Sequence, residues 1–501
     1  MIPHPALMSS APTNPTLPED SCKDIDHCRT LSGLVQSCLV TVLACVWFAV
    51  HRNIPEPKVD RPRSGSALRR AFLFAWHKVL DQRQAANVFV VALLVPEWVL
   101  AWALRQWLVA RGLAAQLENA RAAEIEERAR ATPQAQIVEK DDIDSDAPAA
   151  SSGISTHSAH AQFVEQQSRL VNRVASRRCK KQCEDCGLHC SVDEVYQSEY
   201  DQVAMARRVG TADEAWEIVH AFFIIMGGYN FCGEEGPLHP LTPKNAVELV
   251  GRGRLVRPTS EELANQSKGD ALSKAVAIVQ TLWFVMQCIA RRIDRLPITN
   301  LEVMTLAYTV MTVAMYVVWW DKPLNISCAV RVPEEPVEGE RSDEHGSAWG
   351  RIWVYVVGWQ DLYVDLRKCT RVPTFWAADR ADAAIPADAI ALVVAMVFGA
   401  VHCIAWSYTF QSHLEQQLWR ASAIAIIAVP AALAVGAMVA LVLDNQTSIE
   451  FESSLTACYV PLTLIYITAR IILILISFTS LRMLPTAAYQ TVEWTTFVPH
   501  I

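Results

Sequence analysis

Residues 455–478 of the chain read LTACYVPLTLIYITARIILILISF and contain a single charged side chain, Arg470. A helix needs about 20 predominantly apolar residues to cross the hydrocarbon core of a bilayer, which is about 30 Å thick. The stretch meets that length and carries almost no charge. It therefore predicts a membrane-spanning helix.

The rest of the chain repeats this pattern. Of the 501 residues, 52% are hydrophobic and 19% are charged, whereas soluble domains have about 45–50% apolar and about 25% charged residues. Six more apolar windows have about the spanning length, at residues 31–50, 88–110, 275–292, 301–320, 389–410 and 420–443. The predicted fold class is an all-α polytopic membrane protein with about seven transmembrane helices.

Lysine and arginine residues in short loops set the expected orientation, because short loops rich in these residues stay on the cytosolic side. Basic residues lie between the first two helices, between the third and fourth, and after the fifth and seventh. They are Arg52, Lys58, Arg61, Arg63, Arg69, Arg70, Lys78, Arg83, Arg291, Arg292, Arg295, Arg420 and Arg482. We therefore expect the N-terminal segment 1–30 to lie outside and the tail 479–501 to be cytosolic.

N-glycosylation sequons point to the same orientation, because their acceptor must face the lumen. The sequons begin at Asn265, Asn325 and Asn445, and each falls in a loop assigned to the outside. The sequence therefore predicts a glycoprotein.

The parts outside the predicted helices differ in character. The long outer loop 111–274 includes residues 132–162, whose Pro, Ser, Ala and Asp content predicts disorder, because such a segment cannot bury a core. Its short apolar block 216–232 predicts an interfacial or re-entrant segment.

The second outer loop, 321–388, contains an aromatic stretch that predicts an interfacial helix. The stretch WWDKPL at 319–324 predicts an interface anchor. The predicted membrane segments are 31–110 (helices 1 and 2), 275–320 (helices 3 and 4) and 389–478 (helices 5 to 7).

A cysteine cluster, CKKQCEDCGLHC, occupies residues 179–190 of the long outer loop and contains Cys179, Cys183, Cys186 and Cys190. Cysteines in an oxidising lumen form disulfides, which we expect here. The alternatives are a zinc knuckle, for which the spacing is irregular, and free thiols. We expect no metal site and no cofactor.

Ionisable side chains inside predicted helices are candidates for function, because they cost several kcal/mol at membrane depth unless they are paired or hydrated. Glu97, His402 and Arg470 are the clearest examples. With a rise of 1.5 Å per residue, they share one depth in the predicted topology, and Gln280 and Thr309 lie within a few ångströms of it. The sequence therefore predicts an intramembrane polar layer of Glu97, Gln280, Thr309, His402 and Arg470.

Two interpretations of this layer stay open. Glu97 and Arg470 form a buried ion pair that fixes helix packing, with threonines bonding between helices. Alternatively, the layer lines a cavity that binds a ligand, with His402 or Glu97 exchanging a proton. His220, in the block 216–232, is a further catalytic candidate if that block covers a site; otherwise it belongs to an ordinary docking helix.

Several stretches together resemble a large group of uncharacterised multispan membrane proteins of filamentous fungi, abundant in mushrooms. They are SCLVTVLACVWFAVH, LRQWLVAR, SKGDALSK, the run from QCIARR through LPITNLEVMTLAY to WWDKPL, HCIAWSYTF and VEWTTFVPHI. Where such proteins have His-Gly-Phe-Phe, this chain has His220-Ala-Phe-Phe. The resemblance implies a membrane location in a fungus, and it supplies no catalytic residue.

The function expected from these observations is binding of, or action on, a lipophilic small molecule within the helix bundle, in the setting of fungal secondary metabolism. The sequence does not decide whether the protein is an enzyme. The alternatives are a transporter or channel, or a non-catalytic receptor or scaffold. The expected location is the plasma membrane or an endomembrane, with the lipid bilayer as partner. The net charge of -8 gives no reason to expect a nucleic acid.

Overall fold

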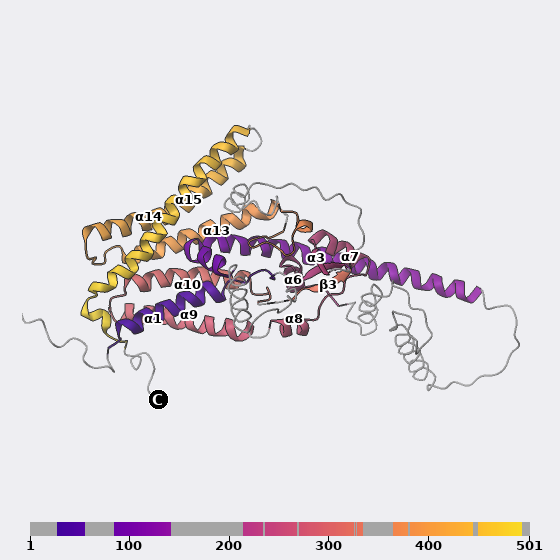
Figure 1. Cartoon of the computed structure of the whole chain (residues 1–501), viewed down its shortest axis with the longest axis horizontal. Coiled ribbons are helices and arrows are strands. Elements are labelled where there is room, and N and C mark those ends of the chain that lie inside the picture. The colour runs from indigo at the N-terminus through magenta and orange to yellow at the C-terminus, as the bar shows by residue number, and fades with distance from the viewer. Residues whose placement is uncertain are drawn as a thin grey trace, which may run out of the picture.

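The computed structural model of the chain describes residues 28–55, 85–141, 214–233, 236–267, 270–324, 326, 328–333, 364–378, 381–443 and 449–492. Within these residues, six helical segments are long and apolar enough to cross a membrane (Figure 1). They are α1 (Leu31–Leu43) with its π-helical continuation η1 (Ala44–Phe48), α9 (Asp270–Ile293), α10 (Asn300–Val318), α13 (Ala381–His402), α14 (His413–Leu443) and α15 (Ile449–Thr479). The predicted mostly helical, membrane-type fold is confirmed at this level.

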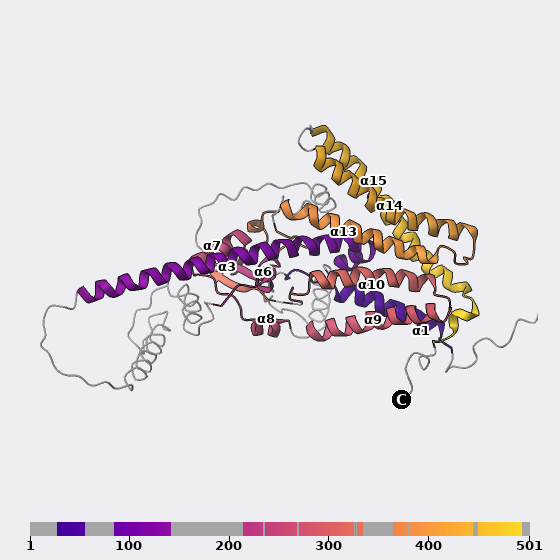
Figure 2. The same cartoon turned by 180° about the vertical axis from the view of Figure 1, so that it is seen from behind.

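The predicted span 88–110 is not one straight helix. A helix over Ala85–Leu94 ends at Val95, and α3 (Pro96–Asp141) leaves the break at an angle of 111°. Proline at the first position of α3 explains the break, because proline is tolerated at a helix start but disrupts a helix interior. α3 then runs far past the other helices (Figures 1 and 2) and extends into the segment 132–162 that the sequence predicted to be disordered.

α1 and α10 run parallel, as contacts at both of their ends show. At their starts, Arg29 pairs with Glu302. At their ends, Lys322 donates a hydrogen bond to the carbonyl of His51. We call these the Arg29 end and the Lys322 end of the bundle. The predicted topology made the two helices antiparallel, and this part of it is wrong.

The two helices on either side of Val95, Ala85–Leu94 and α3, explain why the predicted direction of α10 relative to α1 is wrong. We call them the re-entrant pair. Ala85 lies beside Val50 and Arg52 at the Lys322 end, and the carbonyl of Leu93 meets Tyr308 halfway along α10. Gln106 of α3 is back at the Lys322 end, where it bonds Lys322. The pair therefore enters the bundle and leaves it at the same end, as a re-entrant element does.

Both described termini lie at the Arg29 end. The backbone N–H of Arg29 donates to the carbonyl of Tyr489 at 2.7 Å, and Cys28 forms a β-bridge with Gln490. With six membrane-length helical segments, the two described ends of the chain lie on the same side of the bundle. An N-terminus outside together with a C-terminus inside, as the sequence predicted, does not fit this arrangement.

A small domain packs at the Lys322 end. It contains α6 (Ile218–Ile225), α7 (Pro243–Gly251), α8 (Ser260–Gln266) and a three-stranded sheet of order β2-β1-β3. β1 (Tyr229–Gly233) pairs antiparallel with β2 (Gly236–Pro240) and parallel with β3 (Val330–Pro333). Short 3-10 turns are η3 (Leu366–Lys368), η4 (Cys403–Ala405), η5 (Ser480–Met483) and η6 (Thr486–Tyr489).

The block 216–232 belongs to this domain. The side chains of α6 from His220 to Ile225 are at most 1% exposed, and β1 follows at Tyr229. The structure has here a helix whose residues from His220 to Ile225 are buried, followed by a strand; the expected interfacial or re-entrant position of the block stays a prediction. The burial arises because α6 packs against α3 and α7.

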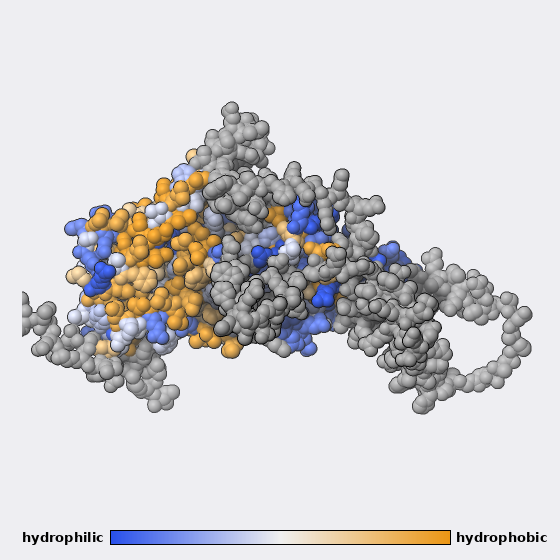
Figure 3. Space-filling model, in the orientation of Figure 1, coloured by the Kyte–Doolittle hydropathy of each residue, from blue (hydrophilic) through white to orange (hydrophobic). Residues whose placement is uncertain are grey.

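The outer surface of the helical bundle is apolar. Figure 3 shows hydrophobic residues gathered in a broad band over the helices, with hydrophilic residues at the Arg29 end and over the small domain. Large apolar side chains in this surface include Val279, Leu282, Val317, Val435 and Leu464, each at least 57% exposed. Such exposure is typical of helices whose solvent is a bilayer, because a soluble protein rarely exposes so large an apolar patch.

Candidate functional site

Arg470, predicted as part of the polar layer, lies near the centre of the bundle and is 1% exposed. Its Nε donates to the carbonyl of Leu94 at 3.2 Å, and its Nη2 donates to the carbonyl of Leu93 at 3.1 Å and to the Tyr308 hydroxyl at 2.9 Å. The guanidinium also lies over the Phe398 ring, 4.1 Å from its centroid. The break in the re-entrant pair supplies the two carbonyls, since a helix end leaves its last carbonyls without partners.

Glu97 is close to Arg470 but does not pair with it directly. The carboxylate is buried, its neighbours are the guanidinium of Arg470 and the hydroxyl of Tyr466, and its Oε2 accepts no hydrogen bond within the described residues. Among the described residues, no ion pair joins Glu97 to Arg470. The predicted ion pair is therefore wrong in its direct form, because backbone carbonyls and Tyr308 already occupy the guanidinium.

His402 lies on the other side of Arg470, near the end of α13. Its Nδ1 donates to the Phe398 carbonyl at 3.0 Å, and its own carbonyl accepts a hydrogen bond from Trp419. Its Nε2 has no hydrogen-bond partner among the described residues. Phe398 separates the imidazole from the guanidinium, because the ring of Phe398 contacts both. Three of the five predicted layer residues, Glu97, His402 and Arg470, thus lie in one region.

The other two predicted layer residues have local partners. Gln280 donates to the Thr41 hydroxyl at 3.0 Å, which joins α9 to α1. Thr309 bonds the carbonyl of Leu306 in its own helix at 2.7 Å. Two further side chains reach this region, Tyr308 of α10 and Tyr466 of α15, and neither belongs to the predicted layer.

His220 has a structural role. Its Nδ1 accepts a hydrogen bond from the backbone N–H of Glu217, closing the capping box at the start of α6, and its Nε2 lies 3.1 Å from the Pro258 carbonyl. Arg257 also contacts the ring. Burial lowers the pKa of His220 below its usual value. These contacts explain the residue without a catalytic function.

Lys322 forms a second buried polar site, at the Lys322 end, where the sequence predicted only an interface anchor. Its Nζ donates to the carbonyl of His51 and to Oε1 of Gln106. It lies 4.7 Å from the centroid of the Trp102 ring and 4.5 Å from that of Trp319. Burial lowers the pKa of Lys322 well below its usual value.

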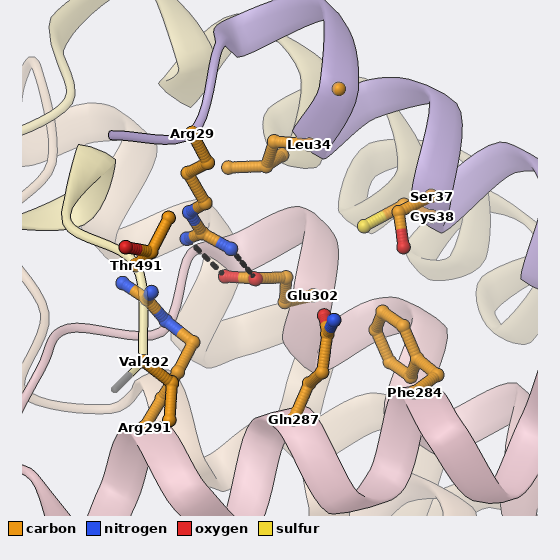
Figure 4. Close-up of a pocket in the computed structure, with 11 residues that line it drawn as sticks. Arg29, Leu34, Ser37, Cys38, Phe284, Gln287, Arg291, Glu302, Thr491 and Val492 are labelled. Carbon is orange, nitrogen blue, oxygen red and sulfur yellow. Dashed lines mark hydrogen bonds and ion pairs between the residues drawn. The ribbon is translucent and has the colours of Figure 1, made fainter. Parts of the chain in front are cut away.

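A pocket of about 210 Å³ opens at the Arg29 end, between α1, α9, α10 and the C-terminal tail (Figure 4). Arg29 donates to both carboxylate oxygens of Glu302 from Nη1 and Nη2, and from Nε to the Ala488 carbonyl at 2.7 Å. Glu302 also accepts from the backbone N–H of Thr299, as the N3 residue of the capping box of α10.

Arg291 enters the same pocket from α9. It donates to the carbonyls of Pro297, Ala488 and Gln490, and among the described residues no carboxylate forms an ion pair with it. Among the described residues that line it, the pocket therefore contains two guanidinium groups and one carboxylate, a net positive charge. Its remaining walls are apolar or uncharged and consist of Gly33, Leu34, Ser37, Cys38, Phe284, Gln287, Thr491 and Val492.

The other predicted sites are at the surface or outside the described residues. Asn265 is exposed in α8, at the Lys322 end. Asn325, Asn445 and the cluster of Cys179, Cys183, Cys186 and Cys190 lie outside the described residues, as does most of the predicted aromatic interfacial helix. No group of three or more His, Cys, Asp or Glu residues comes together within the described ranges.

Comparisons with known proteins place the chain in a family without assigning a reaction. No curated protein and no solved structure is significantly similar to it. One family model matches residues 154–340 and 382–501, which together are more than half of the chain. The chain therefore belongs to this family, a family of unknown function (DUF8562).

Proposed function

We propose that the protein is a multi-pass membrane protein that binds a lipophilic small molecule with an anionic group, and that the pocket at the Arg29 end holds this molecule. The observation that carries the proposal is the unbalanced positive charge of Arg29 and Arg291 beside a partly apolar cavity at the end of an apolar bundle. The resemblance noted above adds a plasma-membrane or endomembrane location and a ligand from fungal secondary metabolism.

The pocket favours an anionic group for a physical reason. Glu302 neutralises one of the two guanidinium groups, and the carbonyls that hold Arg291 carry no net charge. A charged group in a site of low polarity attracts an opposite charge much more strongly than it does in water. Guanidinium groups also match the geometry of carboxylates and phosphates.

The size and lining of the pocket favour a small amphiphile. Sites for drug-sized ligands measure about 300–1,000 Å³, and this pocket is smaller, at about 210 Å³. Leu34, Phe284 and Val492 supply apolar walls, while Ser37 and Gln287 offer hydrogen bonds. A short alkyl chain with a carboxylate combines both requirements.

The test is photo-crosslinking of the full-length protein in nanodiscs with a decanoate analogue that carries a diazirine, followed by mass mapping. We expect crosslinks to residues of α1 and α9 near Ser37 and Phe284. Unlabelled decanoate should compete at least about tenfold better than decanol of the same chain length, equivalent to about 1.4 kcal/mol.

Ser37→Trp fills the pocket and should abolish the crosslink. Leu39→Trp is the matched control, because Leu39 is in the same helix, is 47% exposed and does not line the pocket. Equal competition by decanol would refute the anionic group. A crosslink that survives Ser37→Trp, or one that maps elsewhere, would refute the pocket.

A further inference from the structure

The break between the Ala85–Leu94 helix and α3 brings four chemical features together inside the bundle. The last turn of the first helix ends in carbonyls, and α3 begins with Pro96 and Glu97. Arg470 contacts the carbonyls of Leu93 and Leu94. A helix C-terminus, a helix N-terminus, a guanidinium and a carboxyl therefore meet at one point.

Arg470 does not need Glu97 as a partner in this arrangement. Its Nε and Nη2 donate to two carbonyls and to the Tyr308 hydroxyl. The carbonyls stand at the negative end of a helix dipole, which stabilises a cation. The ring of Phe398 adds a cation–π contact on the face of the guanidinium. Arginine stays charged in proteins, so this set of contacts solvates the charge without an acid.

Glu97, by contrast, has the environment of a neutral carboxyl. The residue is 7% exposed and its Oε2 lacks any hydrogen bond. A buried carboxylate oxygen without a donor is far more costly than a buried, protonated carboxyl. The hydroxyl of Tyr466 lies within reach of this carboxyl. Two buried polar groups thus face each other, and among the described residues Oε2 is left without a donor.

The charged and titratable groups around Glu97 come from several elements. α15 contributes Arg470, Tyr466 and, farther along, Tyr459, and α10 contributes Tyr308. Arg105 of α3 is already paired with Asp388 of α13. The charge of Arg470 and the N-terminus of α3 favour a carboxylate, whereas burial of the carboxyl favours the acid. The surroundings of Glu97 therefore contain groups that favour each of its two protonation states.

We propose that Glu97 is a proton-binding site at this break and that Arg470 exchanges partners with its protonation. With the carboxyl protonated, Arg470 holds Leu93, Leu94 and Tyr308, as observed. When the O–H bond breaks and solvent water takes the proton, the guanidinium turns to the carboxylate and releases the two carbonyls. The end of the Ala85–Leu94 helix then loses its cap, and the angle at Val95 is free to change. This inference is independent of the ligand pocket.

Infrared difference spectroscopy of the full-length protein in nanodiscs tests the proposal through the carboxylic-acid band. We expect a band that disappears as the pH is raised and that is missing from Glu97→Gln. Asp388→Asn is the control, because that carboxylate is 41% exposed and paired with Arg105; it should leave the band unchanged. Retention of decanoate crosslinking or an unchanged melting temperature shows that a variant is folded.

Two further variants keep the test decisive if Glu97→Gln does not fold. Arg470→Gln removes the partner of the carboxylate, so the titration should move to higher pH by about one unit or more, a tenfold change in proton affinity. Tyr466→Phe should also move the titration of Glu97 to higher pH, because it removes a hydroxyl that can donate to the carboxylate. A wild-type band that persists at every pH, one that is never present, or one that neither variant moves would overturn the proposal.

Discussion

At the scale of single residues, Lys322 gives the clearest prediction. Its amino group is enclosed by a carbonyl, an amide and two tryptophan rings, and burial lowers its pKa well below the usual value. Between the lowered pKa and the ordinary lysine value of about 10.4, the unfolded chain binds a proton that the folded chain lacks. The contribution of Lys322 to the free energy of unfolding therefore rises with pH, by up to about 1.4 kcal/mol per pH unit.

Thermal unfolding in detergent at graded pH checks this prediction. We expect wild type to gain stability relative to Lys322→Met as the pH rises through that window. Lys244→Met is the comparison, because that lysine is exposed to solvent in α7. A difference between wild type and Lys322→Met that does not change with pH would mean that the ammonium stays charged in the fold.

The residues of the candidate sites were predictable only in part from the sequence. Glu97, His402 and Arg470 stand out because ionisable groups are rare in apolar helices, and the structure brings them to one region. Gln280 and Thr309 share their depth by count, but a count along the helix does not tell which neighbour a side chain faces. The pocket was missed because Arg29, Arg291 and Glu302 lie at helix ends, where charges are ordinary.

At the scale of elements, the contact between α13 and α14 depends on a glycine. A Cβ at Gly399 would lie 2.6 Å from Cγ1 of Ile427 and 3.1 Å from the carbonyl oxygen of Ile426. Helices in membranes often pack through small residues, which let their backbones approach. We predict that Gly399→Leu destabilises the protein by about 1–3 kcal/mol or more, the usual cost of overpacking.

The melting temperature of purified variants measures this effect. Ala400→Leu adds the same side chain at the next position, where the helix surface is exposed, and should be nearly neutral. Ile427→Ala combined with Gly399→Ala should recover part of the loss of Gly399→Ala alone. If Gly399→Leu and Ala400→Leu have the same stability, the close approach of α13 and α14 is absent.

The helices themselves were largely predictable, and the break was not. The windows 31–50 and 301–320 correspond closely to α1 with η1 and to α10, because hydropathy and length locate a helix of spanning size. The window 88–110 satisfies the same criterion, yet it is divided before Pro96 into two helices with a bend of 111° between them. Hydropathy counts apolar residues and contains no information on direction, so a re-entrant pair looks like a span.

At the scale of the whole molecule, that one element changes the topology. If 88–110 is taken as a membrane-spanning helix, the predicted direction of α1 becomes opposite to the one observed relative to every later helix. Without it, the connection 51–84 and the connection 444–448 both leave the bundle at the Lys322 end, and the tail lies at the Arg29 end. Two sequence signals then disagree. The basic residues of 51–84 favour the cytosol for the side that also contains the sequon at Asn445.

Epitope mapping in intact and permeabilised cells tests the six-helix, re-entrant arrangement most directly. One tag is inserted in the connection 51–84, a second in the connection 444–448 and a third at the C-terminus, each in an otherwise unchanged full-length chain. We predict that the two loop tags become accessible under the same condition and the C-terminal tag under the opposite one. A tag in 51–84 that shares the side of the C-terminal tag, with the tag in 444–448 on the other side, would contradict the arrangement.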